Sequence, residues 1–224
     1  MSKRGLILVE GQTEERFVKQ VLSPHFVGKG LFVTPTILTT KVVKNGPNFK
    51  GGVTSFEKFG SDLRRLLGGA GRDAVVTTLV DYYGLPVDFP GMASRPASAT
   101  AAQRVAHVEA ALAAHFNDGR LLPFLSLHEF EAWLFSCTVT LPRVMAQPNN
   151  GPPFAAICTS VQTPEEINER PDHNPAARLK QVFPGYRKVL HGPIAIERIG
   201  LATVREKCPH FNWWVSRLEA FAAA

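Results

Sequence analysis

The residues in this chain that could do chemistry are carboxylates placed directly after apolar segments. Glu10 follows the apolar run at residues 6–9, and Gly11 then permits the tight turn that a strand-to-helix junction requires. Glu14 lies about one turn into the helix that we expect next, with Thr13 as its N-cap. Ligands of open α/β sheets bind at the carboxyl ends of the strands. An ionised carboxylate at that position is costly to bury unless a cation or hydrogen-bond donors accompany it.

The same pattern of an apolar segment followed by acids occurs twice more. Asp81 follows residues 74–80, whose β-branched and apolar side chains indicate a central strand covered on both faces. Glu129 and Glu131 follow a further expected strand at residues 120–127, where the chain changes to helical spacing. Parallel strands joined by right-handed crossovers have their carboxyl ends at one edge. Acids that are distant in sequence are therefore predicted to converge there.

A cluster of carboxylates needs a partner, because the charges repel one another unless a cation joins them. Oxygen-only ligands suit a hard cation, so we predict Mg²⁺ or Mn²⁺ as the cofactor. Such an ion can generate a hydroxide nucleophile and stabilise the leaving oxygen when a phosphodiester is cleaved. The predicted metal ligands are Glu10, Asp81, Glu129 and Glu131.

Basic residues supply the charge that a phosphate backbone would require. The net charge is +6 and the isoelectric point is about 9.4, which permits a polyanionic partner without demanding one. Basic side chains outnumber acidic ones in residues 41–72, around a glycine-rich loop that lacks the residue order of a P-loop. A solvated helix face beside a loop would have the same composition. The predicted nucleic-acid contacts are Lys41, Lys44, Lys50 and Arg187.

The elements that must hold these residues form an α/β pattern. We expect a mostly parallel central sheet flanked by helices, with a second strand at residues 31–38 that Pro35 restricts to an edge. A helix is expected at residues 100–116, and the remainder of the chain is predicted to be helical, with a loop at residues 183–192. We interpret the chain, 1–224, as a single domain with an α/β core over about 1–136 and a helical C-terminal part over about 137–224.

Composition excludes several classes of protein. The chain has 224 residues and 45% hydrophobic content, enough for a substantial core. Its three cysteines are widely spaced, which argues against a disulfide framework and favours a reducing, cytoplasmic setting. No segment approaches the ~20 apolar residues of a membrane span, so no membrane partner is expected. Oligomeric state is left open.

Longer motifs resemble a known family. VEGQTEERF at 9–17, TLVDYYGLPVDFPG at 78–91, LHEFEAWLF at 127–135 and IGLATVREKCPHFNWW at 199–214 stand in this order. Together they are similar to a large, uncharacterised bacterial toprim-like family, and the resemblance covers nearly the whole chain. It implies a toprim-like, Rossmann-like fold. Toprim relatives include topoisomerases, primases and the overcoming-lysogenization-defect (OLD) nucleases, which often work with ABC-type ATPases in phage defence.

The resemblance assigns roles to several of the residues above. Glu10 matches the toprim glutamate, and Glu14 matches a neighbouring acid of OLD-like members. Asp81 matches the first acid of the toprim Asp-x-Asp, whereas Tyr83 stands where the second acid belongs. Glu131, with Glu129, resembles the later acidic motif, and Lys188 the downstream lysine of these nucleases. The residues that the resemblance implies to be catalytic are Glu10, Glu14, Asp81, Glu131 and Lys188.

The resemblance thus implies a Mg²⁺-dependent phosphodiesterase acting on DNA or RNA, within a defence system that includes an ABC-type or AAA ATPase. Tyr83 removes a metal ligand, which leaves open a degenerate toprim-like binding or effector subunit of an ATPase complex. A third reading, phosphoryl transfer on free nucleotides gripped by the basic loop, would differ in its salt dependence, because binding of a nucleic-acid polymer weakens steeply with salt.

Overall fold

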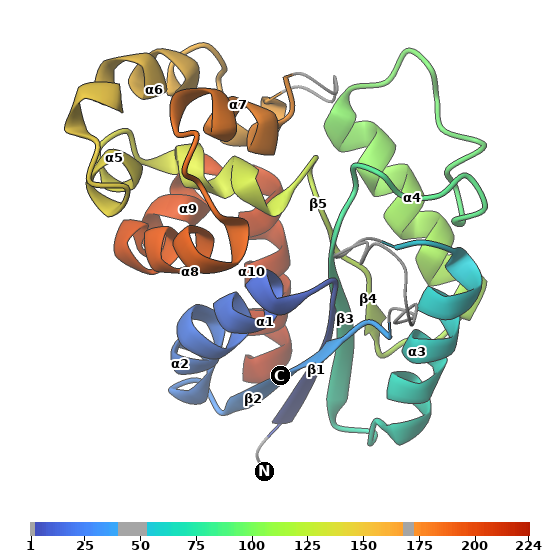
Figure 1. Ribbon diagram of the computed structural model, residues 1–224. Coiled ribbons are helices and arrows are strands. Elements are labelled where there is room, and N and C mark those ends of the chain that lie inside the picture. The colour runs from blue at the N-terminus through green and yellow to red at the C-terminus, as the bar shows by residue number, and fades with distance from the viewer. Residues whose placement is uncertain (1–2, 40–52, 168–172) are drawn as a thin grey trace, which may run out of the picture.

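A parallel sheet forms the centre of the computed structural model, which describes residues 3–39, 53–167 and 173–224 (Figure 1). Its strands stand in the order β2-β1-β3-β4, and β5 also pairs with β3. Every strand pair is parallel. The strands are β1 (Lys3–Val9), β2 (Leu31–Ile37), β3 (Ala74–Asp81), β4 (Leu121–Leu122) and β5 (Leu125–Ser126). The predicted α/β class is confirmed, as is the edge position of β2.

Of the strands predicted from the sequence, β3 matches its prediction and the strand expected at residues 120–127 does not. Every residue of β3 is buried, as expected for an apolar strand between two others. The strand expected at residues 120–127 is instead divided into β4 and β5. Pro123 has no N–H for the ladder, and the Thr78 hydroxyl bonds both backbone groups of Phe124, at 2.7 Å from its O and 2.9 Å from its N.

Helices cover both faces of the sheet, and each face has its own apolar core (Figure 1). Successive residues of β1 alternate between them, with Ile7 in the first core and Leu8 in the second. The first core holds α1 (Gln12–Phe17), the π-helical η1 (Val18–Leu22), α2 (Ser23–Val27) and the C-terminal helices. The second holds α3 (Phe56–Gly69) and α4 (Ala101–Phe116).

The C-terminal part is helical, as predicted, and packs on the face that α1 covers. Trp214 anchors it, because its indole N–H donates a 2.8 Å hydrogen bond to the Thr77 hydroxyl on β3. One expectation is wrong: α8 begins at Lys188, so part of the loop predicted at 183–192 is helix. The elements are η2 (Phe130–Ser136), α5 (Thr140–Val144), η3 (Pro148–Asn150), α6 (Gly151–Cys158), η4 (Pro164–Glu166), α7 (Pro175–Val182), α8 (Lys188–Ile199), α9 (Leu201–Lys207) and α10 (Pro209–Ala223).

The junction between β1 and α1 corrects two further expectations. The N-cap of α1 is Gly11, whereas Thr13 is buried inside the first turn. Gly11 has φ −162°, an extended conformation that any residue adopts, so the turn does not require glycine here. Among the described residues, no helix is both long and apolar enough to span a membrane.

Candidate functional site at the carboxyl edge of the sheet

The structure brings four of the predicted acids together around one lysine at the carboxyl edge of β1 and β3. The Nζ of Lys188 lies 3.0 Å from Asp81 Oδ2, 3.2 Å from Glu131 Oε2 and 3.4 Å from Glu14 Oε1. Glu10 joins them through its Oε2, which accepts a 2.9 Å hydrogen bond from the backbone N–H of Asp81. We call these four carboxylates and Lys188 the acid cluster. Glu10 directly follows β1, and the other members lie in α1, β3, η2 and α8.

Backbone hydrogen bonds position Asp81 and the segment that carries Glu131. Beyond β5 the chain continues alongside β3, and the N–H of Tyr83 donates to the carbonyl of His128 at 2.9 Å. His128 has φ +64°, a left-handed conformation that costs a non-glycine residue about 1 kcal/mol. This turn aims the N–H of Phe130 at Asp81 Oδ1, 2.8 Å away. Asp81 is therefore held by one oxygen while the other faces Lys188.

Close packing of α8 against α1 and η2 places Lys188. Arg16 of α1 donates a 2.8 Å hydrogen bond to the carbonyl of Val189, the second residue of α8. One turn further on, a Cβ at Gly192 would lie 3.2 Å from the Tyr186 hydroxyl and 3.3 Å from the Phe130 ring. A larger residue at Gly192 would thus push α8 away from η2, and Lys188 would move with it.

Negative charge exceeds positive charge in the acid cluster. Burial, with the nearby charge of Asp81, raises the pKa of Glu10 to about 8. Burial likewise raises the pKa of Glu14 and of Glu131, although Lys188 opposes the shift. Burial alone would lower the pKa of Lys188, but the surrounding carboxylates raise it well above its usual value. One ammonium therefore does not balance four carboxylates, and the cluster retains protons near neutral pH.

Glu129 lies at the rim of the cluster and has a partner of its own. Its Oε2 accepts a 2.9 Å hydrogen bond from the backbone N–H of Ala176 in the first turn of α7. Burial, reinforced by the charge of Glu131, raises its pKa to about 7. Glu129 is thus within electrostatic reach of the cluster, and its predicted role as a metal ligand stays a prediction.

One polar group near the cluster, the hydroxyl of Tyr186, is not among the residues predicted from the sequence. The side chain is 5% exposed, and its hydroxyl has no hydrogen-bond partner among the described residues. Burial, and then the charge of Glu131, raise the pKa of Tyr186 well above its usual value. The hydroxyl lies near Thr13, Phe130 and Gly192. Thr13 and Phe130 directly precede the cluster members Glu14 and Glu131, and Gly192 lies one helical turn after Lys188. No spacing rule singles out a tyrosine in an expected loop.

A divalent cation fits the donor chemistry of the cluster, but the ammonium of Lys188 already lies among the donors. All donors are carboxylate oxygens, the type that Mg²⁺ and Mn²⁺ prefer. Glu14 Oε1 and Glu131 Oε2 are buried, and the cationic group beside each is the ammonium of Lys188, at 3.4 and 3.2 Å. The ammonium of Lys188 contacts three of the carboxylates at 3.0–3.4 Å, ordinary ion-pair distances, and so lies where a metal ion would have to bind. Among the described residues, no three Asp, Glu, His or Cys side chains are arranged to hold a metal ion.

The remaining predicted residues fall outside the cluster. Lys41, Lys44 and Lys50 lie outside the described residues. Arg187 is exposed, directly before Lys188, and its backbone N–H donates to His191 Nδ1 at 2.9 Å. Tyr83, at the position of the missing second acid, is 36% exposed and adds no ligand to the site.

Comparisons with known proteins identify a family model and a similar solved structure. A family model described as a domain of unknown function (DUF4276) matches residues 9–219. No curated protein gives a match. The solved C-terminal region of the Burkholderia pseudomallei OLD protein is similar, with 17% identity and a TM-score of 0.46 over 98% of this chain and 100% of that one. At that identity and TM-score, we infer nothing about activity from the likeness.

Proposed function

Because the chain belongs to the DUF4276 family, whose function is unknown, we propose an activity from the site itself: divalent-cation-dependent cleavage of phosphodiester bonds in nucleic acid. The observation that carries this proposal is the convergence of four carboxylates and Lys188 at the carboxyl edge of a parallel sheet. Ligands of such sheets bind at this edge. A surplus of buried carboxylates over positive charge is suited to a cation, and the cation to a phosphate.

Each member of the cluster has a defined task in this proposal. Glu10 and Asp81 are metal ligands, held by backbone hydrogen bonds that fix their orientation. Glu14 and Glu131 are supporting ligands or the general base. Lys188, whose side chain is 34% exposed, turns its ammonium toward the developing charge on the phosphate oxygens. When bound, Mg²⁺ or Mn²⁺ supplies a hydroxide nucleophile and stabilises the leaving oxygen.

Nicking of supercoiled plasmid DNA with Mg²⁺ or Mn²⁺, and cleavage of a labelled RNA, test the proposal. Glu14→Gln should abolish cleavage, whereas Glu15→Gln should leave it unchanged. Glu15 is a matched control because it occupies the same turn of α1 and pairs on the surface with Lys19, at 2.7 Å. Absence of cleavage by the wild-type chain, alone and with an ATPase partner, would sink the enzymatic proposal.

A second candidate, a non-catalytic binding or effector subunit, is favoured by one specific observation. The ammonium of Lys188 stands among the carboxylates at ion-pair distances, and Tyr83 supplies no second acid. In this case Lys188 is a permanent substitute for a metal ion. Titration calorimetry with Mn²⁺ separates the two candidates. Heat of binding in the wild type that is lost in Asp81→Asn supports the enzyme, and its absence in the wild type supports the subunit.

The proposal extends to the setting in which the protein acts. Partnership with an ABC-type or AAA ATPase in phage defence is implied by the sequence resemblance alone. Co-purification with the product of a neighbouring ATPase gene, followed by the same nicking assay, tests this part separately. A complex that forms without any cleavage would favour the effector subunit, and cleavage without any complex would favour an enzyme that acts alone.

A further inference from the structure

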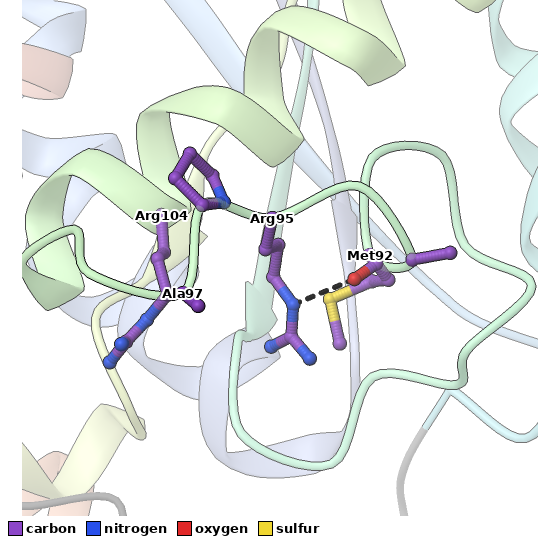
Figure 2. Close-up of a pocket in the computed structure, with 6 residues that line it drawn as sticks. Met92, Arg95, Ala97 and Arg104 are labelled. Atoms are coloured by element: carbon purple, nitrogen blue, oxygen red, sulfur yellow. Dashed lines mark hydrogen bonds between the residues drawn. The ribbon is translucent and has the colours of Figure 1, made fainter.

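A cavity of about 320 Å³ opens between the loop that follows β3 and the first turn of α4 (Figure 2). Its lining consists of Met92, Ala93, Arg95, Pro96, Ala97 and Arg104. One hydrogen bond connects the cavity to the segment that carries the acid cluster, because Arg95 donates to the hydroxyl of Tyr82, the residue directly after Asp81. It lies outside the cluster and contributes no residue to it.

The loop that lines the cavity is packed in place. Phe89 and Met92 are buried in the second apolar core, against α3 and α4. Gly91 has φ +82°, and a Cβ there would lie 2.8 Å from the Cβ of Ala111 on α4, so the backbone approaches that helix as closely as a glycine allows. The shape of the cavity therefore exists before any ligand binds, which lowers the entropy that binding must offset.

Arg95 is oriented by neutral partners. Its Nε donates a 2.8 Å hydrogen bond to the carbonyl of Met92, and its Nη1 donates a 2.7 Å bond to the Tyr82 hydroxyl. The guanidinium carbon also lies 5.7 Å from the centre of the Tyr82 ring. No carboxylate among the described residues pairs with Arg95, and its Nη2 takes part in neither of these bonds. Its charge is therefore fixed in position yet not neutralised by these contacts.

Arg104 brings a second guanidinium to the same cavity from the first turn of α4, where its Nη1 donates to the carbonyl of Ala99 at 3.2 Å. Planar, permanently charged guanidinium groups bind phosphate through paired hydrogen bonds, and they do so better than lysine. Apart from Met92, the apolar lining consists of the small residues Ala93, Pro96 and Ala97, which leave room for a charged group. The chemistry of the cavity is that of a phosphate site.

We propose that this cavity binds a phosphate group of a nucleic-acid strand whose neighbouring phosphodiester lies at the acid cluster. The contact of the nucleic acid with the acid cluster rests on the proposed function. The binding of phosphate in the cavity rests on Arg95 and Arg104 alone. Tyr82 connects the two sites, because it follows Asp81 and orients Arg95. A nucleic-acid strand bound at both sites would lie across the carboxyl edge of β3.

Binding of a fluorescent single-stranded oligonucleotide, followed by anisotropy in EDTA, tests the inference without any cleavage. Arg95→Gln should weaken binding about tenfold, the effect of losing a hydrogen bond to a charged group, and should reduce the slope of log affinity against log salt by about one. The matched control is Arg217→Gln, which removes the same charge from an exposed position on α10. Thermal denaturation establishes that both variants fold. If Arg95→Gln does not fold, Arg95→Lys replaces it: this variant keeps the charge but loses the planar guanidinium, so binding should weaken while the salt slope stays the same.

A thermal-shift titration with inorganic pyrophosphate identifies the source of the phosphate. Weakened binding of both probes by Arg95→Gln supports the proposal. Weakened binding of pyrophosphate alone would assign the cavity to a small phosphorylated molecule and overturn the nucleic-acid contact. Equal oligonucleotide binding by Arg95→Gln and Arg217→Gln, with no effect on pyrophosphate, would overturn the site altogether. A wild-type chain that binds through Arg95 yet never cleaves would instead refute the proposed activity and leave this site intact.

Discussion

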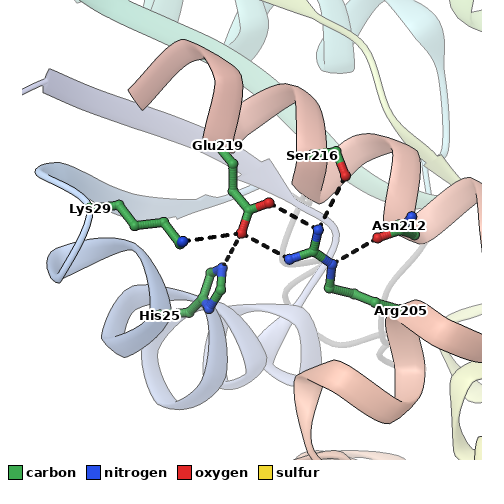
Figure 3. A network of polar contacts seen from close by, with 6 residues as sticks. All are labelled: His25, Lys29, Arg205, Asn212, Ser216 and Glu219. Carbon is green, nitrogen blue, oxygen red and sulfur yellow. Dashed lines mark hydrogen bonds and ion pairs between the residues drawn. The ribbon is translucent and has the colours of Figure 1, made fainter. Parts of the chain in front are cut away.

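Two clusters of charged residues in this molecule have opposite balances. In the acid cluster, four carboxylates share Lys188. In the second cluster, one carboxylate, Glu219 of α10, is contacted by three basic side chains (Figure 3). Arg205 binds both oxygens of Glu219, at 2.8 and 2.9 Å, while His25 Nε2 lies 2.7 Å and Lys29 Nζ 3.6 Å from Oε1.

The two balances shift pKa values in opposite directions. Burial alone would raise the pKa of Glu219, but hydrogen bonds from Arg205 and His25 lower it to about 2. Burial and neighbouring acids raise the pKa of Glu10 to about 8. The Glu219 cluster joins α2, α9 and α10, and it is complete without any further ion. In the acid cluster, carboxylates outnumber basic side chains. An excess of buried negative charge is typical of a ligand-binding site, whereas a neutralised cluster such as that of Glu219 only holds helices together.

The largest expected effect comes from removing the single cation of the acid cluster. Lys188→Met should destabilise the protein by about 2 kcal/mol at pH 8, below the ~3–5 of a fully buried pair, because 34% of its side chain is exposed. The loss should shrink toward pH 5, where Glu10, Glu14 and Glu131 take up protons. Chemical denaturation across this pH range measures both.

A matched substitution, Lys19→Met, removes a surface lysine that pairs with Glu15 one turn away and should cost under about 0.5 kcal/mol. If the two lysine variants lose equal stability at pH 8, the charge imbalance that separates the clusters does not exist. Mn²⁺ should raise the melting temperature of Lys188→Met more than that of the wild type, since the ion would then meet no competing ammonium.

Glu219→Gln tests the other cluster and should have the opposite pH dependence. The folded pKa of about 2 lies below the ordinary value of 4.5, so this carboxylate contributes stability that is present above pH 4.5 and lost as the pH falls toward 2. We expect a loss of about 1 kcal/mol at pH 7 that vanishes near pH 2. A loss that persists at pH 2 would show that packing, and not charge, carries the role of Glu219.

Glu10→Gln should stabilise the protein, a smaller effect of opposite sign. The folded pKa of Glu10 is raised, so its contribution is fully present below pH 4.5 and is lost as the pH rises through about 8. Glutamine cannot ionise, and its amide oxygen can still accept the hydrogen bond from Asp81. The variant should match the wild type at pH 4 and exceed it by roughly 0.5–1 kcal/mol at pH 9. A variant that is less stable than the wild type at pH 9 would contradict the excess of negative charge.

Much of the acid cluster could be predicted from local patterns. Apolar runs before Glu10 and Asp81 identify strands, and parallel pairing then brings their ends to one edge, as the register of Val9 with Leu79 shows. The position of Glu131 followed from the same rule, although the strand before it is broken at Pro123. Short-range periodicity identifies which residues end a strand, and parallel pairing of the strands places those residues at the same edge of the sheet.

Other features depended on contacts between distant segments and could not be predicted from patterns. Lys188 was implied only by the family resemblance, because its place depends on the packing of α8 against α1 and η2. Arg95 stood in a stretch that the composition marks as a loop, and nothing in its spacing indicates the bond to Tyr82. The spacing of residues in a sequence does not indicate which distant segments pack together. The positions of Lys188 and Arg95 therefore become visible only in the three-dimensional structure.

The smallest predicted effect is at Tyr186, one of two buried tyrosines that differ in one hydrogen bond. The Tyr82 hydroxyl accepts a bond from Arg95, whereas the Tyr186 hydroxyl has no partner among the described residues. Tyr82→Phe should therefore cost about 1 kcal/mol. Tyr186→Phe should change stability by less than about 0.5 kcal/mol, because it removes a hydroxyl whose burial already costs free energy. Equal losses in chemical denaturation would mean that Tyr186 has a partner in the folded chain, and its hydroxyl would then not be available to a ligand of the acid cluster.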